Sequence, residues 1–221
     1  MSEKCKDFLV TTITPCHNSA KYLDECWNSI KNQSIGISNI QVIFVDDASD
    51  DGITANMLED YKKEFPNNVI VIKLPINRRQ GGARNEALKY ALGEYVQFLD
   101  SDDTLDQDAL KELYGYAQKH GADFIQYGVI PFEDDRLVTI DSVQERKTFL
   151  SSVSFSCGHS RKFYNRKFIE SLGARFAENL IFEEPLFTYP MFLRFSKILF
   201  IKKDYYNCRV HVESTMAFTA K

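Results

Sequence analysis

Three aspartates stand within four residues of one another, directly after a short apolar segment. Asp100, Asp102 and Asp103 follow the apolar residues 95–99. Carboxylates this close at the end of a buried strand repel each other, so they need a positive partner or full exposure to water. Mg²⁺ and Mn²⁺ prefer oxygen ligands and are commonly held by one or two carboxylates plus substrate phosphates. Asp100 and Asp102 therefore favour a divalent metal site, although a lone Asp-x-Asp is more often a solvated turn.

Polar residues follow two other apolar segments in the same way. Asp46 and Asp47 come directly after residues 40–45 and could accept hydrogen bonds from a nucleobase N–H group or a ribose hydroxyl. A turn that caps the next helix is the structural alternative, because Asp and Ser are common capping residues. His17 follows residues 8–14 and offers a flat ring on which a base could stack, whereas a lone histidine is often structural.

A glycine-rich segment with a basic residue follows a third apolar segment. Arg84 falls in the first turn of a predicted helix, where the helix dipole mildly disfavours a cation, so a ligand explains it better than surface charge does. Gly81 and Gly82 could let the backbone approach that ligand closely. The segment is not a phosphate-binding loop that ends in Gly-Lys-Ser/Thr, because no such residues follow.

Charged residues far along the chain could complete a site. Glu183 or Glu184 precedes a predicted helix and could act as a general base that takes a proton from an acceptor hydroxyl. The alternative is negative charge that complements the helix dipole. Arg209 and His211 alternate on a predicted strand and could reach a metal or a diphosphate, or could be polar residues on an exposed face.

The elements that must position these residues alternate over the first part of the chain. Short β-branched runs without helical period predict strands, and apolar residues that recur every three or four positions predict helices. The predicted strands are 8–14, 40–45, 69–74, 95–99 and 122–129, and the predicted helices are 22–30, a helix ending near 65, 81–92 and 106–120. This order predicts an α/β fold with a mostly parallel sheet and helices on both faces. Because ligands of such sheets bind beyond the carboxyl ends of the strands, the four polar clusters are expected on one rim.

The alternation ends near residue 131. Asp134 and Asp135 suggest the turn of a short hairpin, and residues 161–172 have the pattern of an amphipathic helix. Pro185 suits the first turn of another helix, in which Pro190 is expected to cause a kink. Residues 198–201 and 205–210 are expected to be strands.

Composition excludes several classes of protein. The 221 residues have a net charge of −4 and no basic stripe, so nothing favours nucleic acid binding. The N-terminus lacks the apolar segment of a signal peptide, and no apolar run approaches the ~20 residues of a membrane span. The five cysteines are scattered without a CxxC pair, which favours free thiols in a reducing compartment.

The chain resembles the family 2 glycosyltransferases of the GT-A fold. The resemblance covers residues 8 to about 214, and it is carried in order by ITPCHNSAKYLDECWNSIKNQS, VIFVDDASDDG, NRRQGGARNEALKYALGEYVQFLDSDD, FEEPLF and YNCRVHVES. It implies a Rossmann-like, mostly parallel sheet with a mixed C-terminal acceptor-side half. The whole chain, 1–221, would then form a single domain, with a nucleotide-binding half at about 8–130 and an acceptor-binding half at about 131–221.

The same resemblance implies a role for each candidate. His17 would pack near the base, Asp47 and Asp46 would bind uracil or ribose, and Arg84 would contact the nucleotide or its phosphates. Glu184 would be the catalytic base, with Glu183 in reserve, because the family usually has Glu-Asp at this point. The expected nucleotide-binding residues are Pro15, His17, Asn18, Asp46, Asp47, Asn77, Gly82, Arg84, Asp100 and Ser101, and the expected metal ligands are Asp102, Asp100 and His211.

The implied activity is an inverting, single-displacement transfer of a sugar from a nucleoside diphosphate sugar, with UDP favoured, to an acceptor hydroxyl. Mn²⁺ or Mg²⁺ would assist it. The expected partners are the donor and a glycan or lipid-linked glycan in bacterial surface glycan synthesis. The expected location is the cytoplasm, with peripheral association at the inner face of the cell membrane left open.

Three alternatives stay open at this point. Residues 99–105 resemble the Asp-x-Asp-Gly-Thr-Leu motif of haloacid dehalogenase-type phosphatases, in which the first aspartate is the nucleophile, but Asp103 replaces the glycine. A non-catalytic nucleotide-sugar binding module would fit the glutamate at position 184, where the family usually has an aspartate. Nucleotidyl transfer also uses carboxylates and a metal on such a sheet.

Overall fold

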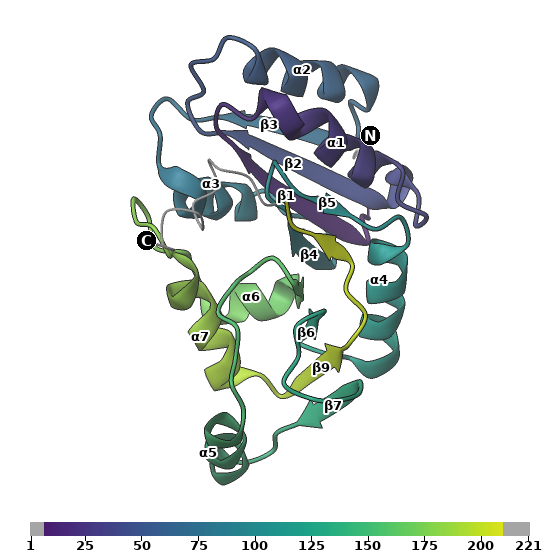
Figure 1. Ribbon diagram of the computed structural model, residues 1–221, viewed down its shortest axis with the longest axis vertical. Helices are drawn as coiled ribbons and strands as arrows, with labels where there is room; N and C mark the ends of the chain where they lie inside the picture. Colours follow the sequence, from purple (N-terminus) through teal and green to yellow (C-terminus); the bar gives the residue numbers. More distant parts are fainter. Residues whose placement is uncertain (1–6, 210–221) are drawn as a thin grey trace, which may run out of the picture.

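An eight-stranded sheet with helices on both faces forms the centre of the computed structural model, which describes residues 7–209 (Figure 1). The strand order is β3-β2-β1-β4-β8-β6-β9-β7. These strands are β1 Val10–Cys16, β2 Ile40–Asp46, β3 Val69–Lys73, β4 Tyr95–Phe98, β6 Phe124–Tyr127, β7 Arg136–Thr139, β8 Lys162–Asn165 and β9 Lys197–Ile201. A separate short pair joins β5 Thr104–Leu105 to β10 Tyr206–Asn207. The α-helices are α1 Ala20–Lys31, α2 Thr54–Glu64, α3 Arg79–Leu88, α4 Ala109–His120, α5 Val143–Ser152, α6 Arg166–Leu172 and α7 Glu184–Arg194, and a 3₁₀ turn covers Ile37–Asn39.

The first half of the sheet is parallel, as the alternation of strands and helices predicts. β1 pairs in parallel with β2 on one side and with β4 on the other, and β3 continues the parallel set beyond β2. The chain builds β1, β2 and β3 outward in one direction and then returns to place β4 on the other side of β1. Strand order therefore reverses between β1 and β4, and ligands of open α/β sheets bind beyond the carboxyl ends of the strands at such a point.

Two apolar clusters, one on each face of the sheet, explain why consecutive strand residues are apolar. Val42 and Phe44 of β2 point into the cluster that holds α1, α2 and α4, whereas Ile43 points into the cluster that holds α3, α6 and α7. A strand buried on both faces loses the alternation of apolar and polar residues. The helix predicted from the spacing of Leu23, Cys26, Trp27 and Ile30 is α1, and these four residues are its buried ones.

The second half joins the same sheet in a way that the sequence pattern did not indicate. Residues 161–172 were predicted as one helix, but 162–165 form β8 and only 166–172 form α6. β8 lies between β4 and β6 and is antiparallel to both. Its residues are mostly buried, so the strand lacks the alternation of apolar and polar residues that would have distinguished it from a helix. Asn165 ends the strand and begins the helix, because its Oδ1 accepts the Phe168 N–H at 3.2 Å.

The hairpin predicted at Asp134 and Asp135 is wrong. β7 pairs antiparallel with β9, which lies about sixty residues later in the chain, and not with the strand before it. Asp135 holds the far end of β9 by accepting the Lys202 N–H at 2.7 Å. Helix α5 was not predicted, whereas α7 begins next to Pro185 as expected and continues past Pro190. The strand predicted at 205–210 is limited to Tyr206–Asn207 within the described residues.

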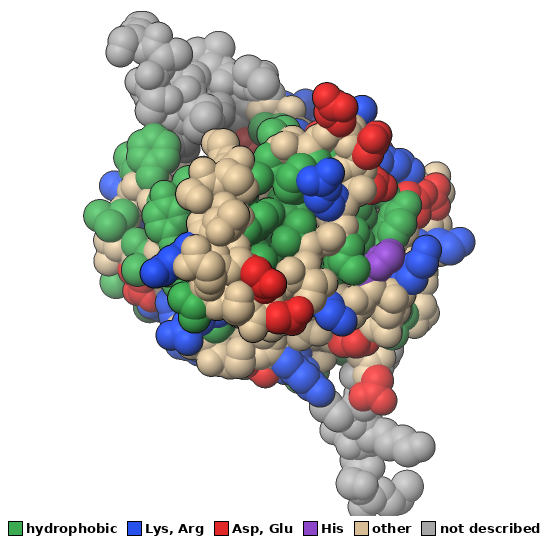
Figure 2. Space-filling model, turned by 90° about the horizontal axis from the view of Figure 1, so that it is seen from below, with side chains coloured by type: hydrophobic (Ala, Val, Ile, Leu, Met, Phe, Trp, Pro, Cys, Tyr) green, Lys and Arg blue, Asp and Glu red, His purple; other side chains and the backbone are tan. Residues whose placement is uncertain are grey.

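Large apolar side chains are exposed on and just before α7. Figure 2 shows hydrophobic side chains along the edge of the molecule on the side where α7 lies in Figure 1. Between residues 180 and 193, the side chains that are more than half exposed are Leu180, Ile181, Phe182, Leu186, Tyr189 and Leu193. Over residues 7–209, none of the helices combines the length and the apolar character needed to cross a bilayer.

Candidate active site

Hydrogen bonds join the loops that follow β1, β2, β3 and β4. Nδ1 of His17 lies 3.0 Å from the carbonyl oxygen of Asp47, and Oδ1 of Asp47 accepts the Arg78 N–H at 2.7 Å. The hydroxyls of Ser19 and Ser101 lie 2.8 Å apart, which links the loop after β1 to the loop after β4. The prediction that these polar clusters share one rim of the sheet is therefore confirmed.

The paired aspartates after β2 are both buried but have different surroundings. Oδ1 of Asp46 accepts the Ser49 N–H at 3.0 Å, which is the turn contact considered as the structural alternative. Burial raises the pKa of Asp47 above its ordinary value, although the Arg78 N–H acts in the opposite direction. The role of Asp47 in binding a nucleotide stays a prediction, while the contact of Asp46 with Ser49 is a structural one.

Asn18 and Pro15, both expected to bind the nucleotide, hold the loop after β1 in place. Oδ1 of Asn18 accepts the N–H groups of Asp50 and Asp51 at 3.0 and 3.2 Å, and Nδ2 donates to the Asp50 carboxylate at 2.7 Å. Pro15 is buried within β1 and faces Val45 in the register of the sheet. These contacts tie the β1 loop to the β2 loop, so both residues act on the shape of the rim.

Asn77 and Gly82 also have structural reasons for their identity. Oδ1 of Asn77 accepts the Arg79 N–H at 2.9 Å, just before α3. A Cβ atom added to Gly82 would lie 2.5 Å from Cβ of Arg78. The absence of a side chain at Gly82 therefore makes room for Arg78, and contact of Gly82 with a nucleotide stays a prediction.

Arg84 is a positive partner of Asp100, the first of the aspartates after β4. Its side chain is 0% exposed, Nη2 lies 2.6 Å from Oδ1 of Asp100, and Nη1 contacts the carboxylate of Glu183. The guanidinium group also lies over the ring of Phe176, 5.3 Å from its centroid. The expectation of a direct contact between Arg84 and a nucleotide is corrected, because a side chain with no exposed surface cannot make one. Arg84 instead positions Asp100 and Glu183.

Replacing Arg84 by Met is expected to lower the free energy of unfolding by about 3 kcal/mol, because it leaves two carboxylates near the interior without their counter-charge. Urea unfolding of the variant and of the unchanged protein measures this difference. Lys89→Met, which breaks a partly exposed pair with Glu86 at the end of α3, is the matched control and should change stability by only about 0.5 kcal/mol. Equal stability of the two variants would contradict the assigned role of Arg84.

Glu183 and Glu184 have different environments although they are neighbours. Glu183 is buried and held by Arg84, whereas Glu184 is the first residue of α7 and its side chain is 24% exposed. Burial raises the pKa of Glu184, but the His159 imidazole and the Arg84 charge outweigh it, and the net pKa is below the ordinary value. Glu184 is therefore an accessible, ionised carboxylate at neutral pH, which a general base must be.

His159 joins the two parts of the site and was not identified from the sequence. Its Nε2 lies 3.3 Å from Oδ1 of Asp100, and its Nδ1 lies 3.6 Å from Oε1 of Glu184. Burial raises the pKa of Asp100, but His159 and Arg84 together reverse this and hold that pKa well below its usual range. No motif surrounds His159, and only a search for unassigned histidines could have found it.

Lys162 of β8 is buried beneath the loop that carries His159. Its Nζ donates to the carbonyl oxygen of Ser156 at 2.8 Å and also to the carbonyl of Gly158. Burial lowers the pKa of Lys162 to about 7, in spite of the opposing effect of Cys157 and Glu184. A lysine in this state links the stability of the fold to pH.

The free energy of unfolding is expected to rise with pH above about pH 7 because of Lys162. Above that pH the folded chain loses the Lys162 proton, whereas the unfolded chain keeps it up to its pKa of ~10.4. Between pH 7 and 8.5 the free energy of unfolding should increase by about 2 kcal/mol relative to Lys162→Met. Denaturant unfolding at a series of pH values measures this, with the exposed Lys167→Met as control. Parallel profiles for the unchanged protein and Lys162→Met would contradict the prediction.

Asp102 and Asp103 differ in burial. Asp103 is buried and accepts the Arg209 N–H at 2.7 Å, and burial raises its pKa to about 6. Asp102 is half-buried at the edge of the loop, and its carbonyl oxygen accepts from Nε of Arg209 at 3.1 Å. Arg209 is thus anchored on this loop and on Glu25, while His211 lies outside the described residues.

The metal prediction can be compared with the donors that are present. Within residues 7–209, no three His, Cys, Asp or Glu side chains come together as a preformed metal cage. Mg²⁺ and Mn²⁺ sites of nucleotide-dependent enzymes need only one or two carboxylates, because substrate phosphates supply further ligands. Asp102, partly exposed at the rim next to Asp100, fits that kind of site.

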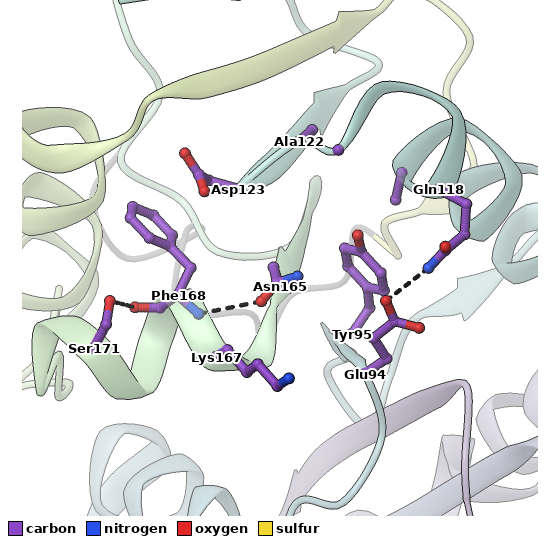
Figure 3. A pocket seen from close by; sticks show the side chains of 11 residues that line it. Glu94, Tyr95, Gln118, Ala122, Asp123, Asn165, Lys167, Phe168 and Ser171 are labelled. Carbon is purple, nitrogen blue, oxygen red and sulfur yellow. Dashed lines mark hydrogen bonds between the residues drawn. The ribbon is translucent and has the colours of Figure 1, made fainter. Parts of the chain in front are cut away.

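A hollow lies elsewhere, where β4 and β6 begin (Figure 3). Its volume is about 480 Å³, and its lining includes Glu94, Gln118, Asp123, Asn165 and Lys167. Three of its polar side chains have partners: Gln118 donates to Glu94 at 2.7 Å, and Asp123 accepts the N–H groups of Ser196 and Lys197. Since it lies at the end of the strands opposite to the rim, we assign no chemistry to it.

Comparison with known proteins gives a consistent result. The model of the family "Glycosyl transferase family 2" matches residues 11–176. Among curated proteins, the chain is similar to the minor teichoic acid biosynthesis protein GgaB of Bacillus subtilis (strain 168), 37% identical over 123 residues that cover 54% of this chain and 13% of that protein. It is also similar to the poly(ribitol-phosphate) beta-N-acetylglucosaminyltransferase TarP of Staphylococcus aureus (strain N315), 31% identical over 89% of this chain and 61% of that protein.

Among solved structures, the fold is similar to that of S. aureus TarS 1–349 in complex with UDP-GlcNAc. The TM-score is 0.79 at 28% sequence identity, and the match covers 96% of this chain and 61% of that one. The α/β fold with a large, mostly parallel sheet and a mixed C-terminal part is therefore confirmed. The chain spans less than two thirds of the length of these relatives.

Proposed function

This chain belongs to glycosyl transferase family 2, and on that premise we propose that it transfers a sugar from a nucleoside diphosphate sugar to an acceptor hydroxyl. The observation that carries the proposal is the short connection from Asp100 through His159 to Glu184. It brings a donor-side carboxylate and an accessible base into one site. That combination is what a single displacement at an anomeric carbon needs, because the base and the leaving group must act at the same time on opposite faces.

The donor side is assigned to the rim formed by the loops after β1, β2 and β4. His17 is exposed and Asp47 lies beside it, so a nucleobase stacked on the ring could donate its N–H group to the carboxylate. A uracil base is favoured by the similarity to TarS, whose structure was solved with UDP-GlcNAc. Asp46, Ser101 and Asp100 shape this rim, and Arg84 supports it from below.

A divalent cation, Mn²⁺ or Mg²⁺, would be held by Asp102, with Asp100 and the substrate diphosphate close by. When bound, it supplies a Lewis acid that neutralises charge on the departing diphosphate. His211, outside the described residues, stays a predicted additional ligand. Asp100 is held by Arg84 and His159 and helps to fix the loop, and Asp102 is partly exposed at the rim.

Glu184 takes the proton from the acceptor hydroxyl as that oxygen attacks the anomeric carbon. Glu184 belongs to the proposed acceptor-binding half, about 131–221, and its neighbour His159 also contacts Asp100 of the proposed nucleotide-binding half, about 8–130. A single displacement inverts the configuration at the anomeric carbon and requires no covalent enzyme intermediate. Glu183 is a poor base in this arrangement, because its carboxylate is committed to Arg84.

The acceptor proposed is a glycan or a lipid-linked glycan of the bacterial surface. Similarity to GgaB and TarP favours a polymer of the teichoic acid class, whose polyol units offer free hydroxyl groups. A cytoplasmic location, with peripheral contact at the inner face of the membrane, stays a prediction.

Thermal-shift measurements with a panel of nucleotide sugars, each with and without Mn²⁺, test the proposal. A donor that binds the native state raises the unfolding midpoint, by an amount that grows with its concentration. We expect one UDP-sugar to raise the midpoint most, and only with the cation present. No shift with any nucleotide would contradict the proposal, and a shift without turnover on any acceptor would favour a non-catalytic binding module.

A further inference from the structure

Nothing in the family resemblance or in the charges of the rim explains why a histidine is buried between two carboxylates. His159 is 4% exposed, and it faces Asp100 with one ring nitrogen and Glu184 with the other. The two carboxylates belong to different parts of the fold, since Asp100 follows β4 and Glu184 begins α7. Relying on the function proposed above, we propose that His159 is a positioning residue that holds the base Glu184 in register with the donor-side carboxylate.

The orientation of the ring is fixed by its neighbours. Phe98 and Phe176 meet it edge to face, with centroids 5.9 and 6.0 Å away and interplanar angles of 81° and 87°. Both phenylalanines are buried, so the imidazole ring cannot turn without displacing core residues. The two nitrogen atoms therefore point in fixed directions, one toward each carboxylate.

The backbone that carries His159 is held from two other elements. Lys162 of β8 donates to the carbonyl groups of Ser156 and Gly158, and Oγ1 of Thr188 in α7 donates to the carbonyl of Cys157 at 2.8 Å. Thr188 lies one turn after Glu184 on the same helix. The loop is thus bound both to the sheet and to α7, the helix that carries Glu184. Such support is needed if His159 is to set the distance between Asp100 and Glu184.

The two contacts of the ring are unequal, and this gives His159 its proposed use. A carboxylate only accepts hydrogen bonds, so the 3.3 Å contact with Asp100 places a hydrogen on Nε2. Nδ1 has no hydrogen-bond partner among the described residues and lies 3.6 Å from Glu184. When Glu184 has taken the proton of the acceptor, its new O–H group can donate to Nδ1. His159 therefore offers the base a hydrogen-bond partner once the proton has moved, while the packed ring fixes the position of Nδ1 beside Glu184 beforehand.

Kinetics of three variants test the role of His159. His159→Phe keeps the ring and removes both nitrogens, and we expect kcat to fall about 10- to 100-fold, which corresponds to one lost hydrogen bond to a charged group. The KM for the donor should change little, because Arg84 still holds Asp100. His159→Asn places an amide near the position of Nδ1 and should restore part of kcat, whereas His159→Gln, which reaches toward Nε2, should restore less.

Controls separate failure of this inference from failure of the proposed function. His120→Asn, at the end of α4, should leave kcat unchanged, and donor-induced thermal shifts should show that each variant still folds and binds. If the unchanged protein transfers no sugar, the proposed function fails. If it does, and His159→Phe transfers as fast, or if its loss lies in the donor KM, the positioning role of His159 is overturned.

Discussion

Glu184→Gln is expected to reduce the rate of sugar transfer by about a thousandfold while leaving donor binding intact. Glutamine keeps the size of the side chain and its place at the start of α7, but it cannot take a proton from the acceptor hydroxyl. General bases contribute roughly 10²- to 10⁴-fold to enzymatic rates. Steady-state release of nucleoside diphosphate in the presence of acceptor measures the loss, and the thermal shift caused by the donor checks that the site is still occupied.

Glu183→Gln is the matched comparison, because it makes the same chemical change one residue earlier. It weakens the buried pair with Arg84, so we expect a lower unfolding midpoint and a much smaller loss of kcat. The reverse pattern, with normal turnover in Glu184→Gln and none in a well-folded Glu183→Gln, would transfer the role of base to Glu183.

Asp102→Asn is expected to remove metal-supported transfer, again by about a thousandfold. Electrostatic help from a Lewis acid at a departing diphosphate is worth several kcal/mol, and about 4 kcal/mol corresponds to a factor of a thousand. Asp102 is partly exposed at the rim and asparagine keeps the size of its side chain, so we expect the fold to be kept. Titration of kcat against Mn²⁺ concentration in both proteins measures the effect.

Asp106→Asn is the control for this prediction. Asp106 lies four residues further on, is exposed, and accepts a hydrogen bond from Asn207 at 2.8 Å, so its loss should leave the Mn²⁺ titration unchanged. An Asp102→Asn variant with the kcat and the Mn²⁺ dependence of the unchanged protein would show that the cation, if any, is held elsewhere.

The rim could be predicted from the sequence because its cause is local and repeated. Each of the first strands is a short apolar run, and each is followed directly by polar residues such as His17, Asp47 and Asp100. Parallel strands joined by helices must end on the same edge of the sheet. The alternation of strands and helices along the sequence therefore brings these loops together, and their proximity allows the hydrogen bonds between them.

The inner contacts could not be predicted, because they depend on residues far apart in the chain. Arg84 looked like a ligand-binding cation at the start of a helix, but Glu183, 99 residues later, buries it. The strand at Lys162 read as part of a helix, since a strand buried on both faces has no alternation. His159 carries no motif at all, and its two carboxylate neighbours become adjacent only when β8 enters the sheet.

Crystals soaked with UDP and Mn²⁺, with data collected at the manganese absorption edge, would show where the cation and the nucleotide bind. We expect an anomalous peak beside the Asp102 carboxylate, with the diphosphate next to it and the uracil ring near His17 and Asp47. A nucleotide bound at the hollow near Glu94 and Asn165, or no manganese peak beside Asp102, would contradict this expectation.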